Sequence, residues 1–434
     1  MMLRRFNAHV LSAALLLTAG PAAAQTLEIL SAEGDPASVE AMNWAIGEFQ
    51  KTHPGVEIEY QVVSWTDLGR RIVASAAAGQ PPDIVHLDDF GASVLSDQGL
   101  LEPAGDVVEA IGTDDYFPIP LDAVTFDGTI WGVPFSNGFN LLWYRKDLYE
   151  KHGLKEPGTW DELLENVRAL HGEASEAGEI YGIALALSNS NHTNDTVQAF
   201  MWSNGATILN RDGEVALNSP EAIAAYEFEK QLFEFAPPGA AQHGNLEVLN
   251  AFATGRVAHS IYPARMVLHV MRTDPDMADA VGAVVLPKGP SPDARYASTM
   301  FTKAWGFPKG ADNTELAKEF VIFLQTGERE IQWLHSVPVH FWPPRRSTAE
   351  SGAYKNDPAL QSPIGQAAAR TIIEDALPHA QPQLSEAGVV NPDTLKILQA
   401  HVLAEMMQRI VLSDTSVEDA VETAVARAKE LLAR

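Results

Sequence analysis

The chain contains no cysteine, and its basic residues are few compared with its acidic ones. Without thiols it cannot use a cysteine nucleophile, a zinc–thiolate site, an iron–sulfur cluster or a structural disulfide. The 30 lysine and arginine residues against 57 aspartate and glutamate residues give a formal net charge of -27. Such a charge disfavours binding to phosphate backbones, so we expect no nucleic acid partner and no attachment to an anionic membrane surface.

Apolar runs long enough to span a membrane are missing, and a short one stands at the start of the chain. Arg4 and Arg5 precede an apolar run from Val10 to Ala19, and Ala22-Ala23-Ala24 stands before Gln25. This order is typical of a secretory signal peptide, and the run is about half of the ~20 residues that a membrane span needs. We expect residues 1–24 to be removed. No cysteine is present for lipid attachment, so we expect a soluble, untethered protein in the periplasm.

The 434 residues, 46% of them hydrophobic, provide for two domains. Strand-like runs at 27–30, 56–63 and 83–87 alternate with helical patterns at 38–51 and 68–78. This alternation predicts βαβ units and an open parallel sheet. Ligands of such sheets bind outside the carboxyl ends of the strands. The loops at these ends contain the candidate ligand contacts Glu33, Asp35, Ser64, Trp65, Asp88 and Asp89.

A second α/β region follows Gly138. Thr159 with Glu162 forms a predicted capping box, and we expect further helices at 219–235 and 313–325. In the tail we expect one helix from about Pro392 to Leu412 and another from Val417 to the C-terminus. Two α/β regions without a long flexible linker predict two lobes that the backbone crosses more than once.

Several short segments then follow one another in a characteristic order. They are AMNWAIGEFQKTHP (41–54), GQPPDIVHLDDF (79–90), DGTIWGVPFSNGFNLLWYRKDL (127–148), TWDEL (159–163), ALNSPE (216–221), AFATGRVA (251–258), WGFP (305–308) and PPRRS (343–347). From about residue 27 to residue 346 this order resembles the extracellular solute-binding proteins of ABC importers, specifically the maltose-binding-protein-like family, most of which bind sugars.

The resemblance implies a two-lobed periplasmic-binding-protein type II fold of the α/β class. Each lobe would be a mainly parallel sheet flanked by helices, with the ligand in the cleft between lobes. We expect lobe 1 to comprise 25–136 and about 287–335, and lobe 2 to comprise 137–286 and about 336–434. The implied function is capture of a mono- or oligosaccharide by hinge closure and its delivery to the transmembrane subunits of an ABC permease. We expect a monomer without cofactor, metal or catalytic activity.

A sugar presents hydroxyl groups and apolar C–H faces, so its site should combine carboxylates and amides with aromatic rings. Two departures from the family pattern bear on the ligand. Tyr262-Pro-Ala-Arg265 stands where a Gly-Pro-Trp pattern is commoner, and Lys303-Ala-Trp305 stands for Gly-Gly-Trp. By the resemblance, further ligand contacts would be Phe135, Asn137, Asn204, Tyr262, Arg265, Lys303, Trp305, Trp342 and Arg345.

Each candidate also has an ordinary structural interpretation. Asp88 or Asp89 could cap the following helix, Lys303 could face solvent, and Arg345 could pair with carboxylates. Should Arg265, Lys303 and Arg345 instead face the ligand, an acidic sugar or a phosphorylated polyol such as glycerol phosphate is an open alternative.

Other classes of protein find little support. The sequence lacks a Gly-x-Ser-x-Gly elbow, a phosphate-binding Gly-x-x-x-x-Gly-Lys loop and a His-Glu-x-x-His pair. A secreted carbohydrate-active enzyme would need two carboxylates facing each other across the scissile bond, whereas Asp88 and Asp89 are neighbours in sequence. The histidines are scattered without metal-ligand spacing, so we expect no metal site.

Overall fold

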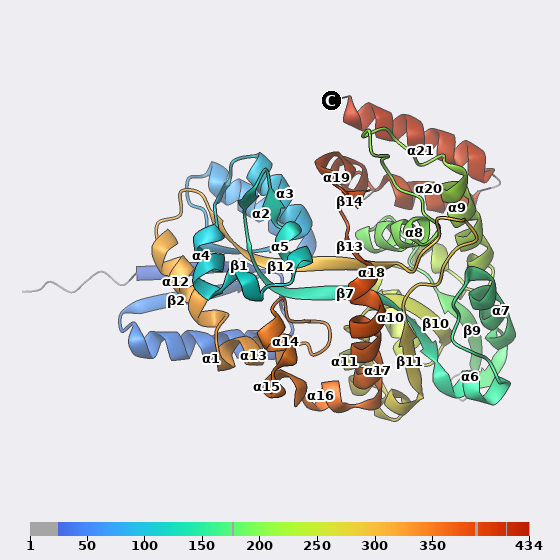
Figure 1. Ribbon diagram of the computed structural model, residues 1–434, viewed down its shortest axis with the longest axis horizontal. Helices are drawn as coiled ribbons and strands as arrows, with labels where there is room; N and C mark the ends of the chain where they lie inside the picture. Colours follow the sequence, from blue (N-terminus) through green and yellow to red (C-terminus); the bar gives the residue numbers. More distant parts are fainter. Residues whose placement is uncertain (1–24, 176–177, 387–388, 414, 434) are drawn as a thin grey trace, which may run out of the picture.

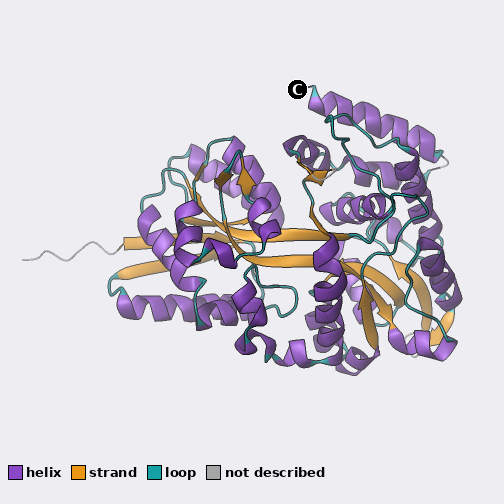
Figure 2. Ribbon diagram, in the orientation of Figure 1, coloured by secondary structure: helices purple, strands orange, loops and turns teal. Residues whose placement is uncertain are grey.

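The computed structural model describes residues 25–175, 178–386, 389–413 and 415–433. The predicted signal peptide, residues 1–24, lies outside the described residues. Figure 1 shows two lobes, and Figure 2 shows that long strands run from one lobe into the other with helices packed around them. The predicted two-lobed α/β fold is therefore confirmed.

The sheet of the N-terminal lobe begins with three parallel strands. Strand β1 (Gln25–Ser31) lies between β2 (Val56–Val62) and β3 (Ile84–Asp88), with Leu27 opposite Ile58 and Ile29 opposite Ile84. These strands alternate with α1 (Pro36–Thr52), α2 (Trp65–Ala77) and α3 (Asp89–Asp97), as the βαβ prediction requires. Short elements follow: β4 (Leu101–Glu102), α4 (Gly105–Ile111), η1 (Thr113–Asp115), α5 (Pro118–Asp122), β5 (Thr125–Phe126) and β6 (Thr129–Ile130).

Two long antiparallel strands, β7 (Val133–Arg145) and β12 (Ser298–Pro308), join the lobes. β12 pairs with β3 on one side and with β7 on the other, and β7 continues the sheet to β10 (Val257–Pro263), β9 (Gly178–Ala184) and β8 (Glu173–Ser175). β11 (Val281–Val284) also pairs with β7, and β13 (Ala380–Pro382) with β12. The mainly parallel arrangement expected for each lobe thus holds for β1 to β3. The remainder is mixed. β7 and β12 run antiparallel to each other and to β3, β10 and β11, whereas β13 pairs in parallel with β12 and β9 with β10.

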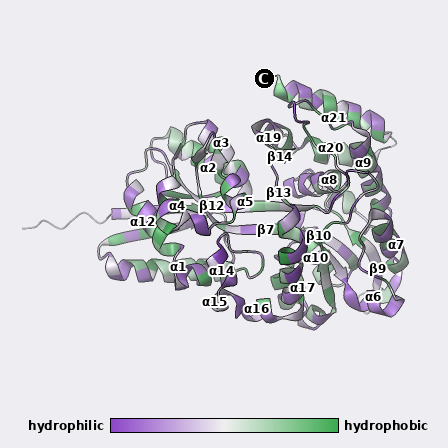
Figure 3. Cartoon of the chain, viewed as in Figure 1, coloured by the Kyte–Doolittle hydropathy of each residue, from purple (hydrophilic) through white to green (hydrophobic). Residues whose placement is uncertain are grey.

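Helices of the C-terminal lobe surround its strands. The predicted capping box is present: Glu162 N–H donates to Thr159 Oγ1 at 3.3 Å, and Thr159 N–H donates to Glu162 Oε2 at 3.0 Å. Figure 3 shows that outer helices such as α21 carry both hydrophilic and hydrophobic residues, as expected when one face packs on a core. The helices are α6 (Lys146–His152), α7 (Trp160–Leu170), α8 (Asn191–Ser203), α9 (Pro220–Phe233), η2 (Ala240–Gln242), α10 (Asn245–Ala253), α11 (Met266–Thr273), η3 (Pro275–Ala280), α16 (Pro358–Gln361), α17 (Pro363–Thr371), η4 (Ile372–Ala376), α18 (Leu377–His379), α19 (Pro392–Gln399), α20 (Val402–Leu412) and α21 (Val417–Leu432).

The single tail helix that we predicted from Pro392 to Leu412 is wrong. The structure has two helices, α19 and α20, and His401 between them takes a left-handed conformation with φ 52°. Asn194 on α8 stabilises the break, because its Nδ2 donates to Leu398 O at 2.8 Å and its Oδ1 accepts from Ala404 N–H at 3.1 Å. The apolar periodicity of the sequence continues across the break, so the break is determined by Asn194, a residue distant in sequence.

The chain returns to the N-terminal lobe after β12 through α12 (Thr314–Leu324) and α13 (Glu328–His335), followed by α14 (Arg346–Glu350) and α15 (Gly352–Lys355). The segment 336–347 also contacts this lobe: Phe117 N–H donates to Pro344 O at 2.9 Å, and Ser336 Oγ lies 2.9 Å from Ser38 Oγ. Conversely, Gly289 N–H donates to Ser203 O of α8 at 3.0 Å. We therefore propose that 336–347 belongs to the first lobe and 287–297 to the second, in place of the boundaries expected near 287 and 335.

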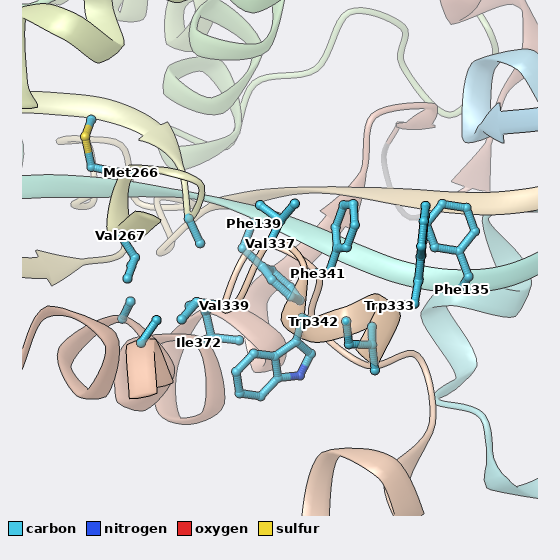
Figure 4. Packing of buried hydrophobic residues seen from close by; sticks show 14 of the residues in the cluster. Phe135, Phe139, Met266, Val267, Trp333, Val337, Val339, Phe341, Trp342 and Ile372 are labelled. Atoms are coloured by element: carbon cyan, nitrogen blue, oxygen red, sulfur yellow. The ribbon is translucent and has the colours of Figure 1, made fainter. Parts of the chain in front are cut away.

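A large apolar core lies beside the joining strands (Figure 4). Phe135 stacks on Trp305 with ring centroids 4.6 Å apart, and Trp333 and Phe341 stack at 5.7 Å. These rings fix the two strands at the point where they leave the N-terminal lobe. A further core within the C-terminal lobe is formed mainly by α7 to α9 and α19 to α21.

Candidate functional site

A cavity of about 560 Å³ lies between the two lobes. One wall comes from the loop after β1, the first residue of α2 and the junction of β3 with α3, and the other from α8, α10 and the end of β10. This volume is in the range of small-molecule sites. The lining residues are Ala32, Glu33, Gly34, Asp35, Trp65, Asp88, Asp89, Phe90, Asn191, His192, Asp195, Asn245, Leu246, Leu249, Tyr262, Pro263, Arg265, Phe301, Lys303, His340 and Gln383.

Four charged side chains at one end of this cavity pair with one another. Glu33 accepts from Lys303 Nζ through Oε1, and its Oε2 lies 3.2 Å from Arg265 Nη2. Arg265 also pairs with Asp35 through Nη1. Burial raises the pKa of the Glu33 carboxyl, but the charges of Lys303, Arg265 and His86 outweigh it and lower the pKa to about 2. Since Arg265 follows β10 and its two acidic partners follow β1, these ion pairs connect the lobes.

Three further carboxylates in the cavity have no cationic partner of this kind. Asp88 is the N-cap of α3, and its Oδ1 accepts from Gly91 N–H at 2.6 Å. Asp89 is 1% exposed, and neither of its oxygens has a hydrogen-bond partner among the described residues. Asp195 on α8 accepts from Gln383 Nε2. Burial and mutual repulsion raise the pKa of Asp89 well above its ordinary value and that of Asp195 to about 8.

Aromatic and imidazole groups complete the lining. Trp65 is 43% exposed, and Lys303 Nζ lies 5.3 Å from the centroid of its ring. Phe301 lies against Gly138 of β7, where a Cβ would stand 1.9 Å from Phe301 Cε2. Glycine at this position is therefore required for the ring to lie where it does. His192 and His340 are both more than nine-tenths buried.

The structure brings eight of the predicted site residues together around the cavity. Asp88 has both roles that we considered, because it caps α3 and also lines the cavity. Lys303 does not face solvent but is buried against Glu33. The eight are Glu33, Asp35, Trp65, Asp88, Asp89, Tyr262, Arg265 and Lys303.

The other predicted residues do not line this cavity. Phe135 and Trp305 stack in the core of the N-terminal lobe, and Ser64 Oγ donates to Asp67 Oδ2 at 2.6 Å. Asn137 and Trp342 exchange two backbone hydrogen bonds, of 2.8 and 3.0 Å.

Asn204, at the end of α8, holds a loop of the C-terminal lobe rather than a ligand. Its Oδ1 accepts from Ser291 N–H at 2.9 Å, and its Nδ2 donates to Glu221 O at 2.8 Å. Both ends of the amide are therefore bound by backbone groups away from the cavity.

Arg345, expected as a ligand clamp, is instead a structural cation of the N-terminal lobe. Its guanidinium pairs with Glu330, donates to Gln325 O at 2.8 Å and lies 3.5 Å from Asp115. Since this side chain is 10% exposed and its donors are engaged, no free fork remains for a ligand. The contacts of Arg345 thus match the alternative interpretation, in which this arginine pairs with carboxylates.

Sequence reasoning missed several lining residues. Phe301 is two residues from Lys303 on β12, so the alternation of a strand places both on one face and could have revealed it. His192 and Asp195 are three residues apart on α8, the spacing of one helix face. No local signal marks His340 or Gln383, which arrive from segments distant in sequence.

A second cavity, of about 570 Å³, lies between α2 and α3. It shares Trp65, Asp88, Phe90 and Asn191 with the first cavity, and its other walls are mainly apolar, including Leu68, Ile72 and Val94. The interlobe cavity thus has a mainly apolar neighbour, with which it shares these four residues.

Two lobes joined by crossing strands around a polar cavity define a protein of the hinge-closing, ligand-binding class. The family model of the bacterial extracellular solute-binding proteins matches residues 33–328, which is more than half of the chain. The chain therefore belongs to this family, as the sequence motifs indicated.

Individual relatives agree with this assignment. The putative ABC transporter periplasmic-binding protein YcjN of Escherichia coli (strain K12) is 27% identical over 322 residues, covering 73% of this chain and 72% of YcjN. A solved ABC transporter solute-binding protein from Thermotoga lettingae, bound with α-D-tagatose, is 25% identical with a TM-score of 0.75 and covers 94% of this chain and 100% of that chain. Maltose-bound MalE3 of T. maritima shares the fold at 22% identity and a TM-score of 0.77, covering 94% and 100%.

Two further observations concern membranes and metals. Within the described ranges, none of the helices has both the length and the apolar composition for crossing a membrane. In the same part of the chain, no three histidine or acidic side chains are arranged to hold a metal ion.

Proposed function

We propose that this protein is the solute-capturing component of an ABC importer and that it binds a saccharide or polyol in the interlobe cavity. The observation that carries the proposal is the composition of this cavity, in which carboxylates from both lobes and the amides of Asn191, Asn245 and Gln383 lie beside the rings of Trp65, Tyr262 and Phe301. Hydroxyl groups would donate to the carboxylates, and apolar sugar faces would lie against the rings. The tagatose complex of the Thermotoga lettingae protein supports the same class of ligand.

The mechanism follows from a site divided between two lobes. A ligand that contacts both walls binds the closed form more tightly and shifts the population toward it. Closure would present a changed surface to the transmembrane subunits of a permease. We propose that the protein acts as a monomer in the periplasm after removal of residues 1–24 and that the ligand leaves it chemically unchanged.

A phosphorylated or acidic ligand is less well supported than a neutral one. Lys303 and Arg265, the cations of the cavity wall, are already paired with Glu33 and Asp35. Burial and repulsion among Asp88, Asp89 and Asp195 already raise the pKa of Asp89 and Asp195, so an additional anion beside them would be unfavourable. We therefore favour a neutral or cationic ligand over glycerol phosphate.

The test is a binding screen of the chain from Gln25 onward. Thermal-shift assays against neutral sugars, polyols, sugar acids and phosphorylated polyols should give stabilisation by one of the first two classes, confirmed by calorimetry. Mass spectrometry of the recovered ligand should find it intact. Stabilisation by phosphorylated polyols alone, or recovery of a cleaved product, would contradict the proposal.

A further inference from the structure

The cavity wall carries more carboxyl groups than its own cations pair with. Burial and mutual repulsion raise the pKa of Asp89 and Asp195, so a cation that enters the site would favour their ionised forms. The wall contains five acidic side chains and two cationic ones, Arg265 and Lys303. Both cations pair with Glu33, and Arg265 pairs with Asp35 as well. This cluster is balanced within itself. Asp88, Asp89 and Asp195 form no ion pair among the described residues, although the charge of Lys303 acts on Asp88.

The three remaining carboxylates act on one another across the cleft. Asp88 and Asp89 stand where β3 meets α3, and Asp195 stands on α8 of the opposite lobe. The charges of Asp88 and Asp195 both raise the pKa of Asp89, so the three groups are close enough to repel. Their polar contacts within the protein are few: Gly91 N–H to Asp88, Gln383 Nε2 to Asp195, and only the adjacent backbone N–H groups of Asp89 and Phe90 near the Asp89 carboxyl.

The imidazoles of the same cavity point independently to a missing polar ligand. His192 Nε2 and His340 Nδ1 have no hydrogen-bond partner among the described residues, and the two side chains are 8% and 4% exposed. Burial lowers the pKa of His192 to about 4 and that of His340 well below its ordinary value. Both rings are therefore neutral near pH 7 and offer hydrogen bonds without supplying positive charge. Buried polar atoms of this kind are ordinarily satisfied.

A bare metal ion does not suit this arrangement. The described residues provide no cluster of three ligands around a common point, and a cavity of about 560 Å³ is far larger than an ion requires. An organic cation that also carries hydroxyl groups would fill the volume, neutralise the carboxylates and engage the imidazoles.

We propose that the ligand is an amine-bearing sugar or polyol whose ammonium group lies between Asp88 on one wall and Asp195 on the other, with the buried Asp89 beside Asp88. This inference rests on the proposed function and specifies further that the saccharide or polyol carries a positive charge. The ammonium donates up to three hydrogen bonds, and carboxylates from both lobes accept them. Because the carboxylates belong to both lobes, binding of the amine favours the closed form.

The test compares matched pairs that differ in one amino group: glucosamine with glucose, galactosamine with galactose, and 1-amino-1-deoxysorbitol with sorbitol. Calorimetry on the chain from Gln25 onward, at a pH where the amine is protonated, should give at least about tenfold tighter binding for the amine of one pair, as expected when a neutral hydrogen bond becomes charge-assisted. Asp195→Asn should reduce this ratio toward one. Asp97→Asn, at the exposed end of α3, is the charge-matched control and should preserve it.

The outcomes separate this inference from the proposed function. Equal or tighter binding of the hydroxyl partner would overturn the amine assignment and leave saccharide binding intact. Absence of binding in every pair, with stabilisation by phosphorylated polyols instead, would overturn both. Stabilisation by Ca²⁺ or Mg²⁺ alone that Asp195→Asn abolishes would also overturn the amine assignment. Asp88→Asn, which retains a good helix cap, serves as a second variant should Asp195→Asn fail to fold.

Discussion

Replacing Lys303 by methionine tests whether this buried ammonium serves Glu33 or the ligand. The side chain of Lys303 is 6% exposed and that of Glu33 is 2% exposed. The variant therefore leaves the buried Glu33 carboxylate with Arg265, 3.2 Å away, as its remaining cation. Removing one partner of a buried pair costs about 3–5 kcal/mol. The depression of the Glu33 pKa from 4.5 to about 2 also corresponds to about 3 kcal/mol at ~1.4 kcal/mol per unit.

We take about 3 kcal/mol as the upper end of the loss, because burial lowers the pKa of Lys303 itself and desolvation of the ammonium offsets part of the pairing energy. An unfolding entropy of about 2.1 cal/mol/K per residue over roughly 410 residues then gives a fall in Tm of up to about 4 °C if the chain unfolds as one unit. The sign of the pH effect is also fixed. A depressed carboxyl pKa stabilises above about pH 4.5, and this contribution is lost as the pH falls toward 2. The variant, in which Arg265 alone pairs with Glu33, should show a weaker acid dependence.

The assay is thermal unfolding followed by circular dichroism, with Lys318→Met as the matched control. Lys318 pairs with Asp106 at 2.7 Å on the surface, where an ion pair contributes about 0–1 kcal/mol. The double variant Glu33→Gln with Lys303→Met should regain much of the stability, because no unpaired charge is left. If Lys303→Met is as stable as the control and loses affinity for anionic ligands alone, the lysine serves a ligand and our reasoning is refuted.

Three other variants follow from the same contacts. Arg265→Gln removes the ion pairs of this arginine between the lobes, so the unliganded variant should have a larger radius of gyration in solution scattering. The control Arg272→Gln, on the exposed side of α11, should leave the radius unchanged. Equal radii for the two variants would contradict the interlobe role of Arg265. Asp89→Asn should raise the Tm of the unliganded protein, since it removes a buried carboxylate without hydrogen bonds, and should weaken ligand binding; a lower Tm without ligand would count against the burial argument. The folded pKa of Asp195 is raised to about 8, so its contribution to stability is complete below about pH 4 and is lost as the pH rises through 8. Asp195→Asn should therefore flatten the pH profile of Tm over that interval. An unchanged profile would refute the raised pKa.

Local patterns predicted the first part of the fold well, for reasons visible in particular elements. Strands β1 to β3 and helices α1 to α3 are adjacent in sequence and in space, so their alternation alone specifies the βαβ arrangement. The capping box at Thr159 is likewise a local contact. The break at His401 was missed because the amide that stabilises it belongs to Asn194, about 200 positions earlier.

The sequence predicted those residues of the candidate site that directly follow a strand. Glu33, Asp35, Asp88 and Asp89 follow β1 and β3 directly, and parallel strands bring such loops to one edge of a sheet. Asp195, on the opposite wall, reaches the same cavity through the strands that join the lobes.

The sequence alone determined the class of fold, the family and the residue types at the strand ends, because these depend on periodicity, capping and motif order along the chain. Only the tertiary structure decided what each charge faces. Lys303 and Arg345 are both cations in family-matched segments, yet one lines the cavity beside Glu33 and the other is held by Glu330 inside a lobe. The reason is physical: the partner that neutralises a buried charge is selected by packing between segments distant in sequence, and no local pattern records that choice.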